Sequence, residues 1–101
     1  MTSARKLEGE LLTECAEWIW EQLQADGYEM AGELVDLILE TERELGVQAQ
    51  SLPEIARVLE DEFRMRGISG APLEITAALI LAVLEWEDDF LGLAGIHRAD
   101  S

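Results

Sequence analysis

The chain has 101 residues, of which 49% are hydrophobic, and its 22 acidic against 7 basic residues give a formal net charge of -15. This length favours one domain with a single core, and the apolar content argues against intrinsic disorder. A strongly negative field repels phosphate backbones and anionic membrane surfaces, so direct binding to nucleic acid or to membranes is not expected. The single cysteine, Cys15, can form no internal disulfide, which fits a cytoplasmic protein.

Apolar residues recur three and four positions apart almost throughout, which predicts an all-α fold. Glycines and a Ser-Leu-Pro-Glu start signal place four helices at about residues 7–25, 29–45, 52–66 and 72–91. The connections between them are short, so we expect antiparallel neighbours in one compact four-helix domain spanning residues 1–101. Residues 1–6 and 96–101 are expected to be loose tails.

The predicted fourth helix contains an uncharged stretch, ITAALILAVL, at residues 75–84. As a helix this stretch measures about 15 Å, roughly half the thickness of a bilayer's hydrocarbon core, so it is expected to be a core segment and not a membrane span. A helix that is apolar on every side needs cover on every side. We therefore predict a homodimer through this helix, the alternative being a helix central to a monomer; the expected interface residues are Leu73, Ile80, Leu81, Leu84 and Trp86.

Four acids follow the apolar stretch, namely Glu85, Glu87, Asp88 and Asp89. Negative charge at a helix carboxyl terminus opposes the helix dipole. We expect these side chains to be exposed, where solvent screens them. The alternative is that arginines from a partner or from the third helix neutralise them.

Two pairs of carboxylates three residues apart lie on the first two predicted helices: Glu14 with Glu17, and Glu33 with Asp36. Residues at this spacing lie on adjacent turns, so both carboxylates of a pair can reach one hard cation. Any acidic amphipathic helix also contains such pairs, and solvated faces are the simpler interpretation.

An E-x-x-E helix followed by an E-x-x-D helix resembles the MazG-like all-α nucleotide pyrophosphatases. The Leu45-Gly46-Val47 turn and the later Phe63-Arg64-Met65-Arg66 segment are similar to that family's order, so the resemblance covers residues 11–66. It implies Mg²⁺-dependent hydrolysis of a nucleoside triphosphate to the monophosphate and pyrophosphate. The implied Mg²⁺ ligands are Glu14, Glu17, Glu33 and Asp36, and the phosphates would be bound by Arg57, Arg64 and Arg66.

Other catalytic signals are absent from the sequence. The only histidine, His97, lies in the expected tail, Cys15 lies on an apolar helix face, and no glycine-rich phosphate loop or zinc-ligand cluster occurs. Trp20 and Trp86 are candidates for interface anchors or for packing across the bundle.

The leading hypothesis is a non-enzymatic, cytoplasmic, homodimeric interaction module without a cofactor, which offers an acidic surface to a basic protein partner. One alternative is the Mg²⁺-dependent pyrophosphatase. The other is a DNA mimic that binds a basic nucleic-acid-binding protein.

Overall fold

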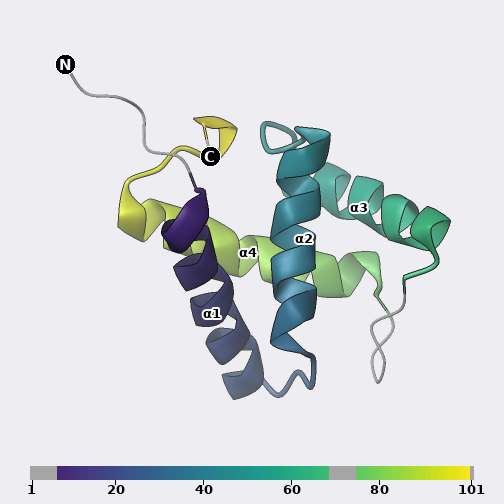
Figure 1. Cartoon of the computed structure of the whole chain (residues 1–101), viewed down its shortest axis with the longest axis horizontal. Coiled ribbons are helices and arrows are strands. Elements are labelled where there is room, and N and C mark those ends of the chain that lie inside the picture. The colour runs from purple at the N-terminus through teal and green to yellow at the C-terminus, as the bar shows by residue number, and fades with distance from the viewer. Residues whose placement is uncertain (1–6, 69–74, 101) are drawn as a thin grey trace.

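A computed structural model describes residues 7–68 and 75–100 and places four α-helices in these ranges. They are α1 (Gly9–Ala25), α2 (Gly32–Leu45), α3 (Leu52–Arg66) and α4 (Ala77–Ala94), and a 3-10 turn, η1 (Arg98–Asp100), follows. The described ranges contain no strand, so the predicted all-α class is confirmed. The helices α1 and α2 form an antiparallel hairpin, α4 crosses both of them, and α3 runs alongside α4 in the opposite direction (Figure 1).

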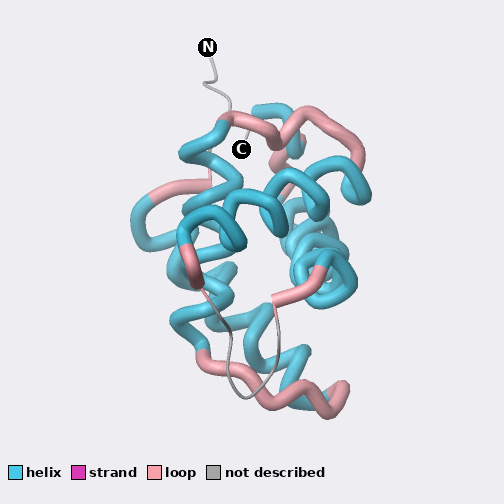
Figure 2. The backbone as a smooth tube through the Cα atoms, turned by 90° about the vertical axis from the view of Figure 1, so that its right-hand side faces the viewer, coloured by secondary structure: helices cyan, strands magenta, loops and turns pink. Residues whose placement is uncertain are grey.

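The helix ends follow from local sequence. The Ser51 hydroxyl accepts a hydrogen bond from the Glu54 N–H (3.4 Å), and the Thr76 hydroxyl accepts one from the Leu79 N–H (3.2 Å), so each caps the start of a helix. In addition, the Ala77 N–H donates to the Glu60 carboxylate at 2.7 Å, which ties the start of α4 to α3. Residues 26–31 join α1 to α2 and residues 46–51 join α2 to α3, and Figure 2 draws both short loops in pink.

Three helices end at a glycine with positive φ, where a side chain would be strained: Gly46 (68°), Gly67 (69°) and Gly95 (72°). After each glycine an apolar residue folds back and donates its N–H to the helix, as Ile96 does to the Leu91 carbonyl at 2.9 Å. The predicted stops at Gly46 and Gly67 are therefore confirmed. By contrast, α4 runs through Gly92 and ends only before Gly95.

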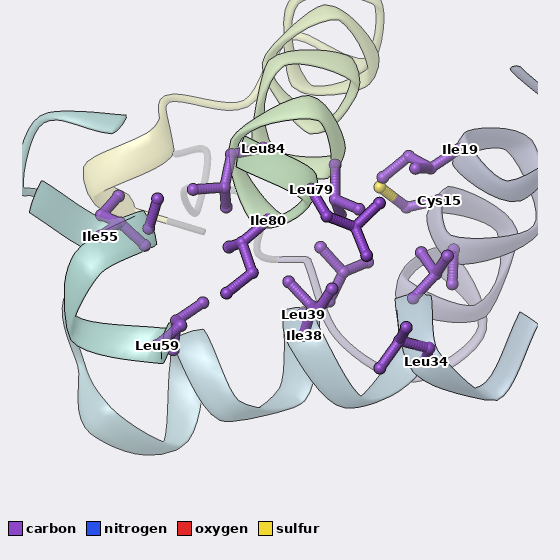
Figure 3. Packing of buried hydrophobic residues seen from close by; sticks show 14 of the residues in the cluster. Cys15, Ile19, Leu34, Ile38, Leu39, Ile55, Leu59, Leu79, Ile80 and Leu84 are labelled. Atoms are coloured by element: carbon purple, nitrogen blue, oxygen red, sulfur yellow. The ribbon is translucent and has the colours of Figure 1, made fainter. Parts of the chain in front are cut away.

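The core lies where α4 meets the other three helices. Figure 3 shows side chains of all four helices converging there, among them Cys15 of α1, Ile38 of α2, Leu59 of α3 and Ile80 of α4. The opposite side of α4 carries exposed residues, including Glu85 and Asp89. No helix in the described ranges is long and apolar enough to cross a membrane.

This packing bears on the residues expected at a dimer interface. Ile80 and Leu84 have no exposed surface, so in this fold they offer nothing to a second copy. Leu81 and Trp86 are half-buried, and Leu73 falls outside the described residues. The helix α4 therefore packs against the three other helices of the same copy, and the homodimer stays a prediction.

The segment after α4 differs from the expected loose tail. Ile96 is only 6% exposed, because it folds back over the end of α4. Arg98 is also held, since its guanidinium group contacts carboxylates of α2 and α4. The exception is His97, whose side chain is exposed as expected.

A pair of substitutions tests the central position of α4. We expect Ile80→Ala to lower the free energy of unfolding by about 2–5 kcal/mol, the usual cost of emptying a packed aliphatic site, and Leu81→Ala to cost clearly less. Urea unfolding measures both. The midpoint should not depend on protein concentration; a midpoint that rises with concentration in the wild type would instead support the dimer.

Candidate functional site

The α1–α2 hairpin carries an acidic face without basic side chains. Residues 7–42 contain eleven Asp and Glu and no Lys or Arg, and ten of these acids are exposed. The opposite sides of the two helices are buried, as at Ile19 and Ile38. Because the helices are amphipathic, the charged side chains are confined to the outer surface of the hairpin.

Most arginines in the described ranges pair with acids that lie outside this face. Of the five arginines in the described ranges, four form ion pairs with acids of this same chain: Arg43, Arg64, Arg66 and Arg98. None of these pairs involves an exposed acid of residues 7–40. The negative charge of the α1–α2 face, which we call the acidic face, is therefore uncompensated within the described structure.

A hollow of about 240 Å³ lies in the acidic face between the two helices, and its described lining residues are Ala16, Glu17, Trp20, Gly32, Glu33 and Asp36. Trp20 is 37% exposed. Its indole N–H donates to the Met30 carbonyl at 2.9 Å, which fixes the orientation of the ring. Gly32 lies against this ring: an added Cβ would be 3.8 Å from Trp20 Cδ1, so any larger side chain would begin to fill the hollow.

Three of the four carboxylates predicted to bind Mg²⁺ meet at this hollow. Burial raises the pKa of Asp36 above its ordinary value, and the negative charges of Glu33 and Glu17 raise it further. Glu14 does not join them, since it lines a separate hollow with Gly9, Glu10 and Thr13. Within the described ranges no group of three or more His, Cys, Asp or Glu side chains is arranged to hold a metal ion. The four-acid ligand set is therefore not assembled.

The arginines expected to bind phosphates are also not assembled at the hollow. Arg64 pairs with Asp61 at 3.3 Å, and Arg66 pairs with Glu62 and Glu44 at 2.7 Å each. All the described residues that line the hollow belong to α1 and α2, whereas these arginines belong to α3. The hollow offers negative charge and an aromatic ring, without a phosphate-binding group among those residues.

A second constellation, which we call the buried cluster, was missed by sequence reasoning. It consists of Glu42, Arg43, Glu87 and Arg98, and both carboxylates are 0% exposed. Arg43 contacts Glu42 at 3.0 Å and Glu87 at 2.8 Å, while Arg98 Nη1 contacts Glu42 at 2.6 Å and Glu87 at 2.7 Å. The cluster therefore connects α2, α4 and the turn after α4.

The expectation that the acids at the end of α4 are exposed is wrong for Glu87, although Glu85, Asp88 and Asp89 are indeed exposed. Glu87 lies three residues after Leu84 and four before Leu91, both buried, so the helical period places it on the inner side. That spacing was the available signal. The compensating charges come from Arg43, in the last turn of α2, and from Arg98 in the segment expected to be loose.

The protonation of the buried cluster reflects its burial. Burial and the negative charge of the neighbouring Glu87 carboxylate raise the pKa of Glu42 to about 8, against the opposing effect of Arg98 and Arg43. Burial also raises the pKa of the Cys15 thiol to about 12, with a further rise from Glu87. Cys15 is thus a neutral core residue, which makes it a poor nucleophile.

Two of the three tryptophans hold α1 against α4. The rings of Trp18 and Trp86 meet edge to face, with centroids 5.6 Å apart and planes at 81°. The Trp86 N–H donates to the Asp26 carboxylate at 3.2 Å. Trp86 therefore packs across the bundle, whereas Trp20 lines the hollow.

Comparisons with models of protein families, with curated proteins and with solved structures found no match for this chain. The MazG-like resemblance consequently stays a prediction from motif spacing. Any functional inference has to come from the geometry of the chain.

Removing one charge tests the buried cluster. We expect Glu87→Gln to lower the free energy of unfolding by about 3–5 kcal/mol, because both guanidinium groups lose a buried counter-charge. The matched change Glu85→Gln, two residues away on the exposed side of the same helix, should stay within about 0.5 kcal/mol of the wild type. Chemical denaturation at pH 7 measures both. Equal effects for the two variants would show that the Glu87 pairing contributes nothing to stability.

Proposed function

We propose that this protein is a non-enzymatic interaction module that binds a basic segment of a partner protein on the acidic face of α1 and α2. The observation that carries the proposal is the hollow in that face, where an exposed Trp20 stands beside Glu17, Glu33 and Asp36. A surface with one sign of charge attracts an oppositely charged partner and accelerates its association.

The distribution of charge supports a basic partner over any other. The exposed acids of residues 7–40 have no Lys or Arg among them in the sequence. A cationic segment would supply this missing counter-charge, and it would remove like-charge repulsion such as that between Asp36 and its neighbours Glu33 and Glu17. Nucleic acid and anionic lipid would add to the repulsion instead.

The hollow suits one cationic side chain of such a segment. An Arg or Lys placed in it would lie over the face of Trp20, an arrangement that contributes about 0.5–1 kcal/mol when exposed. The carboxylates at the rim would pair with its charge. Gly32 leaves the space that the side chain needs, and the hydrogen bond from Trp20 to Met30 holds the ring ready before binding.

The test uses a fluorescent peptide of about ten residues rich in Arg, with a Glu-rich peptide as the negative probe. We expect the triple variant Glu17→Gln, Glu33→Gln, Asp36→Asn to weaken binding by about 10- to 100-fold, since three partly desolvated ion pairs are lost. Fluorescence anisotropy at 0.15 M salt measures the affinity.

Two controls distinguish binding at the hollow from non-specific binding through the overall negative charge. The triple variant Glu54→Gln, Glu85→Gln, Asp89→Asn removes the same number of exposed charges outside the hollow and should weaken binding much less. Gly32→Leu changes no charge but fills the hollow, and it should weaken binding while circular dichroism shows the fold intact. Equal losses in the two triple variants would reduce the interaction to net charge and contradict a specific site.

The Mg²⁺-dependent pyrophosphatase is the second candidate, favoured by the convergence of Glu17, Glu33 and Asp36 on one hollow. Against it stand the separate position of Glu14 and the engagement of Arg64 and Arg66 elsewhere. The four carboxylates therefore do not form one ligand set in this fold.

Magnesium titration distinguishes the two candidates. If the module proposal is right, the melting temperature should change little as Mg²⁺ rises from 0.1 to about 10 mM beyond the effect of matched Na⁺ strength, because no ligand set binds the native state. A saturable rise in the wild type that is lost in Glu33→Gln would favour the metal-dependent alternative and count against the module.

A further inference from the structure

Arg98 occupies a set of acceptors that the helices α2 and α4 provide. Its Nη1 lies 2.6 Å from a Glu42 oxygen and 2.7 Å from a Glu87 oxygen. Its Nη2 donates to the Leu84 carbonyl at 3.0 Å, and its Nε pairs with the Asp88 carboxylate. None of these four acceptors belongs to the turn that carries Arg98. Together they form a site on α2 and α4, which we call the arginine site.

The acceptors of the arginine site are distributed over three nitrogens of the bound group. A guanidinium group carries five N–H donors in a rigid fork, whereas an ammonium group is a compact point of charge. Only the fork can reach the carboxylates and the carbonyl at once. Acceptors in this arrangement therefore select arginine over lysine.

The arginine site requires a cation. Glu42 and Glu87 are both fully buried, and their two charges are balanced by those of Arg43 and Arg98. Without Arg98, one buried negative charge has no counter-charge within the cluster, which is costly. A conformation in which the turn has left therefore favours the entry of another cation.

Arg98 does not satisfy the acceptors of the site completely. A single nitrogen, Nη1, contacts both Glu42 and Glu87, and within the described structure neither Glu87 oxygen accepts a hydrogen bond of favourable angle. The position of Arg98 is constrained by its own turn, because Ile96 folds back and donates its N–H to the Leu91 carbonyl. A guanidinium group without this tether is free to present separate nitrogens to the two carboxylates.

The arginine site can be reached from solvent. The Arg98 side chain is 13% exposed and that of Asp88 is 46% exposed, so this pair marks the outer end of the site. In the described ranges no helix other than η1 follows α4. Release of the turn therefore does not require any of the four α-helices to unfold.

We propose that the arginine site is a second binding site of the module, which takes an arginine side chain of a basic partner, and that Arg98 is an internal ligand which this arginine displaces. The partner is the basic segment already proposed for the hollow. The two sites share no described residue, so one can fail while the other holds.

Arg98→Ala empties the site and tests its selectivity. We expect about 50 mM N-acetyl-arginine methylamide to raise the melting temperature of this variant by about 3–8 °C more than N-acetyl-lysine methylamide does, because a ligand of the native state stabilises it by mass action. The two compounds carry the same charge, so the difference excludes simple screening of the acidic chain. Arg64→Ala removes an arginine that is 69% exposed, and as the matched control it should respond equally to both compounds.

Glu87→Gln in the Arg98→Ala background assigns the response to the site. Glu42 is then balanced by Arg43 alone, so the double variant should melt no lower than Arg98→Ala. It should also respond equally to the two compounds, because the site no longer needs a second cation. Circular dichroism measures the melting temperatures.

Displacement is measured in the wild type by amide hydrogen exchange. The Ile96 N–H, bonded to the Leu91 carbonyl, reports on the turn, and the Ile19 N–H reports on the centre of α1. We expect a saturating Arg-rich peptide of about ten residues to lower the protection of Ile96 by about threefold or more and to leave Ile19 unchanged. A Lys-rich peptide of equal charge should lower neither.

The triple variant Glu17→Gln, Glu33→Gln, Asp36→Asn separates the two sites in the same experiment, since it lacks the acids of the hollow. Loss of Ile96 protection at a higher peptide concentration than in the wild type shows that both sites bind. Loss at an unchanged concentration shows that the arginine site binds without help from the hollow, which contradicts the proposed function and supports the arginine site.

Each of three results would overturn the arginine site. Equal responses of Arg98→Ala to both compounds show that the acceptors do not select a guanidinium group, and a selective response retained by the double variant places the binding elsewhere. Unchanged Ile96 protection in the wild type with saturating Arg-rich peptide shows that Arg98 is not displaced. This last measurement decides even if Arg98→Ala fails to fold.

Discussion

A shortage of positive charge governs this structure. With 7 basic residues for 22 acids, the chain can neutralise only a few carboxylates. Arg43 and Arg98 pair with the fully buried acids, where an unpaired charge would be most costly, and Arg64 and Arg66 pair along α3 and with the end of α2. The acidic face is what remains after the arginines have been placed at these sites. Among the described residues no arginine forms an ion pair with this face, and this lack of counter-charge favours a basic partner outside the chain.

The central helix explains why buried acids occur at all. α4 packs against the three other helices, so its inner side is enclosed along its whole length from Leu79 to Leu91. Glu87 falls on this inner side by its helical position, and Glu42 approaches it from the last turn of α2. Two carboxylates in contact are tolerable only with guanidinium groups beside them, and one of these groups is supplied by the turn that follows Gly95. The folding of the chain end is thereby linked to the polar part of the core.

Local signals were sufficient for most of the fold. The Ser51 cap, the stops at Gly46 and Gly67 and the three- and four-residue spacing of apolar side chains depend on neighbours in sequence, and the helices they predict are present. The pairing of Glu87 with Arg98 depends on contact between α2, α4 and the turn after α4, and no local sequence pattern specifies that contact. The sequence alone shows that Glu87 has a helical position on the inner side of α4. It does not show that Arg43 and Arg98 neutralise its charge. Glu14 and Glu17 give a second example. The E-x-x-E pattern treats the two carboxylates as equivalent, yet of the two only Glu17 lines the hollow between α1 and α2.

The hollow and the buried cluster share α2 but are electrostatically separate. Glu33 and Glu42 are nine residues apart, which is about 13 Å along a helix. The charges that act on Glu42 are those of Glu87, Arg98 and Arg43, whereas the charges that act on Asp36 in the hollow are those of Glu33 and Glu17. The turn after α4, which completes the buried cluster, contributes none of the described residues that line the hollow, because these belong to α1 and α2. The two sites are thus built from different side chains, even though the scarcity of arginine underlies both.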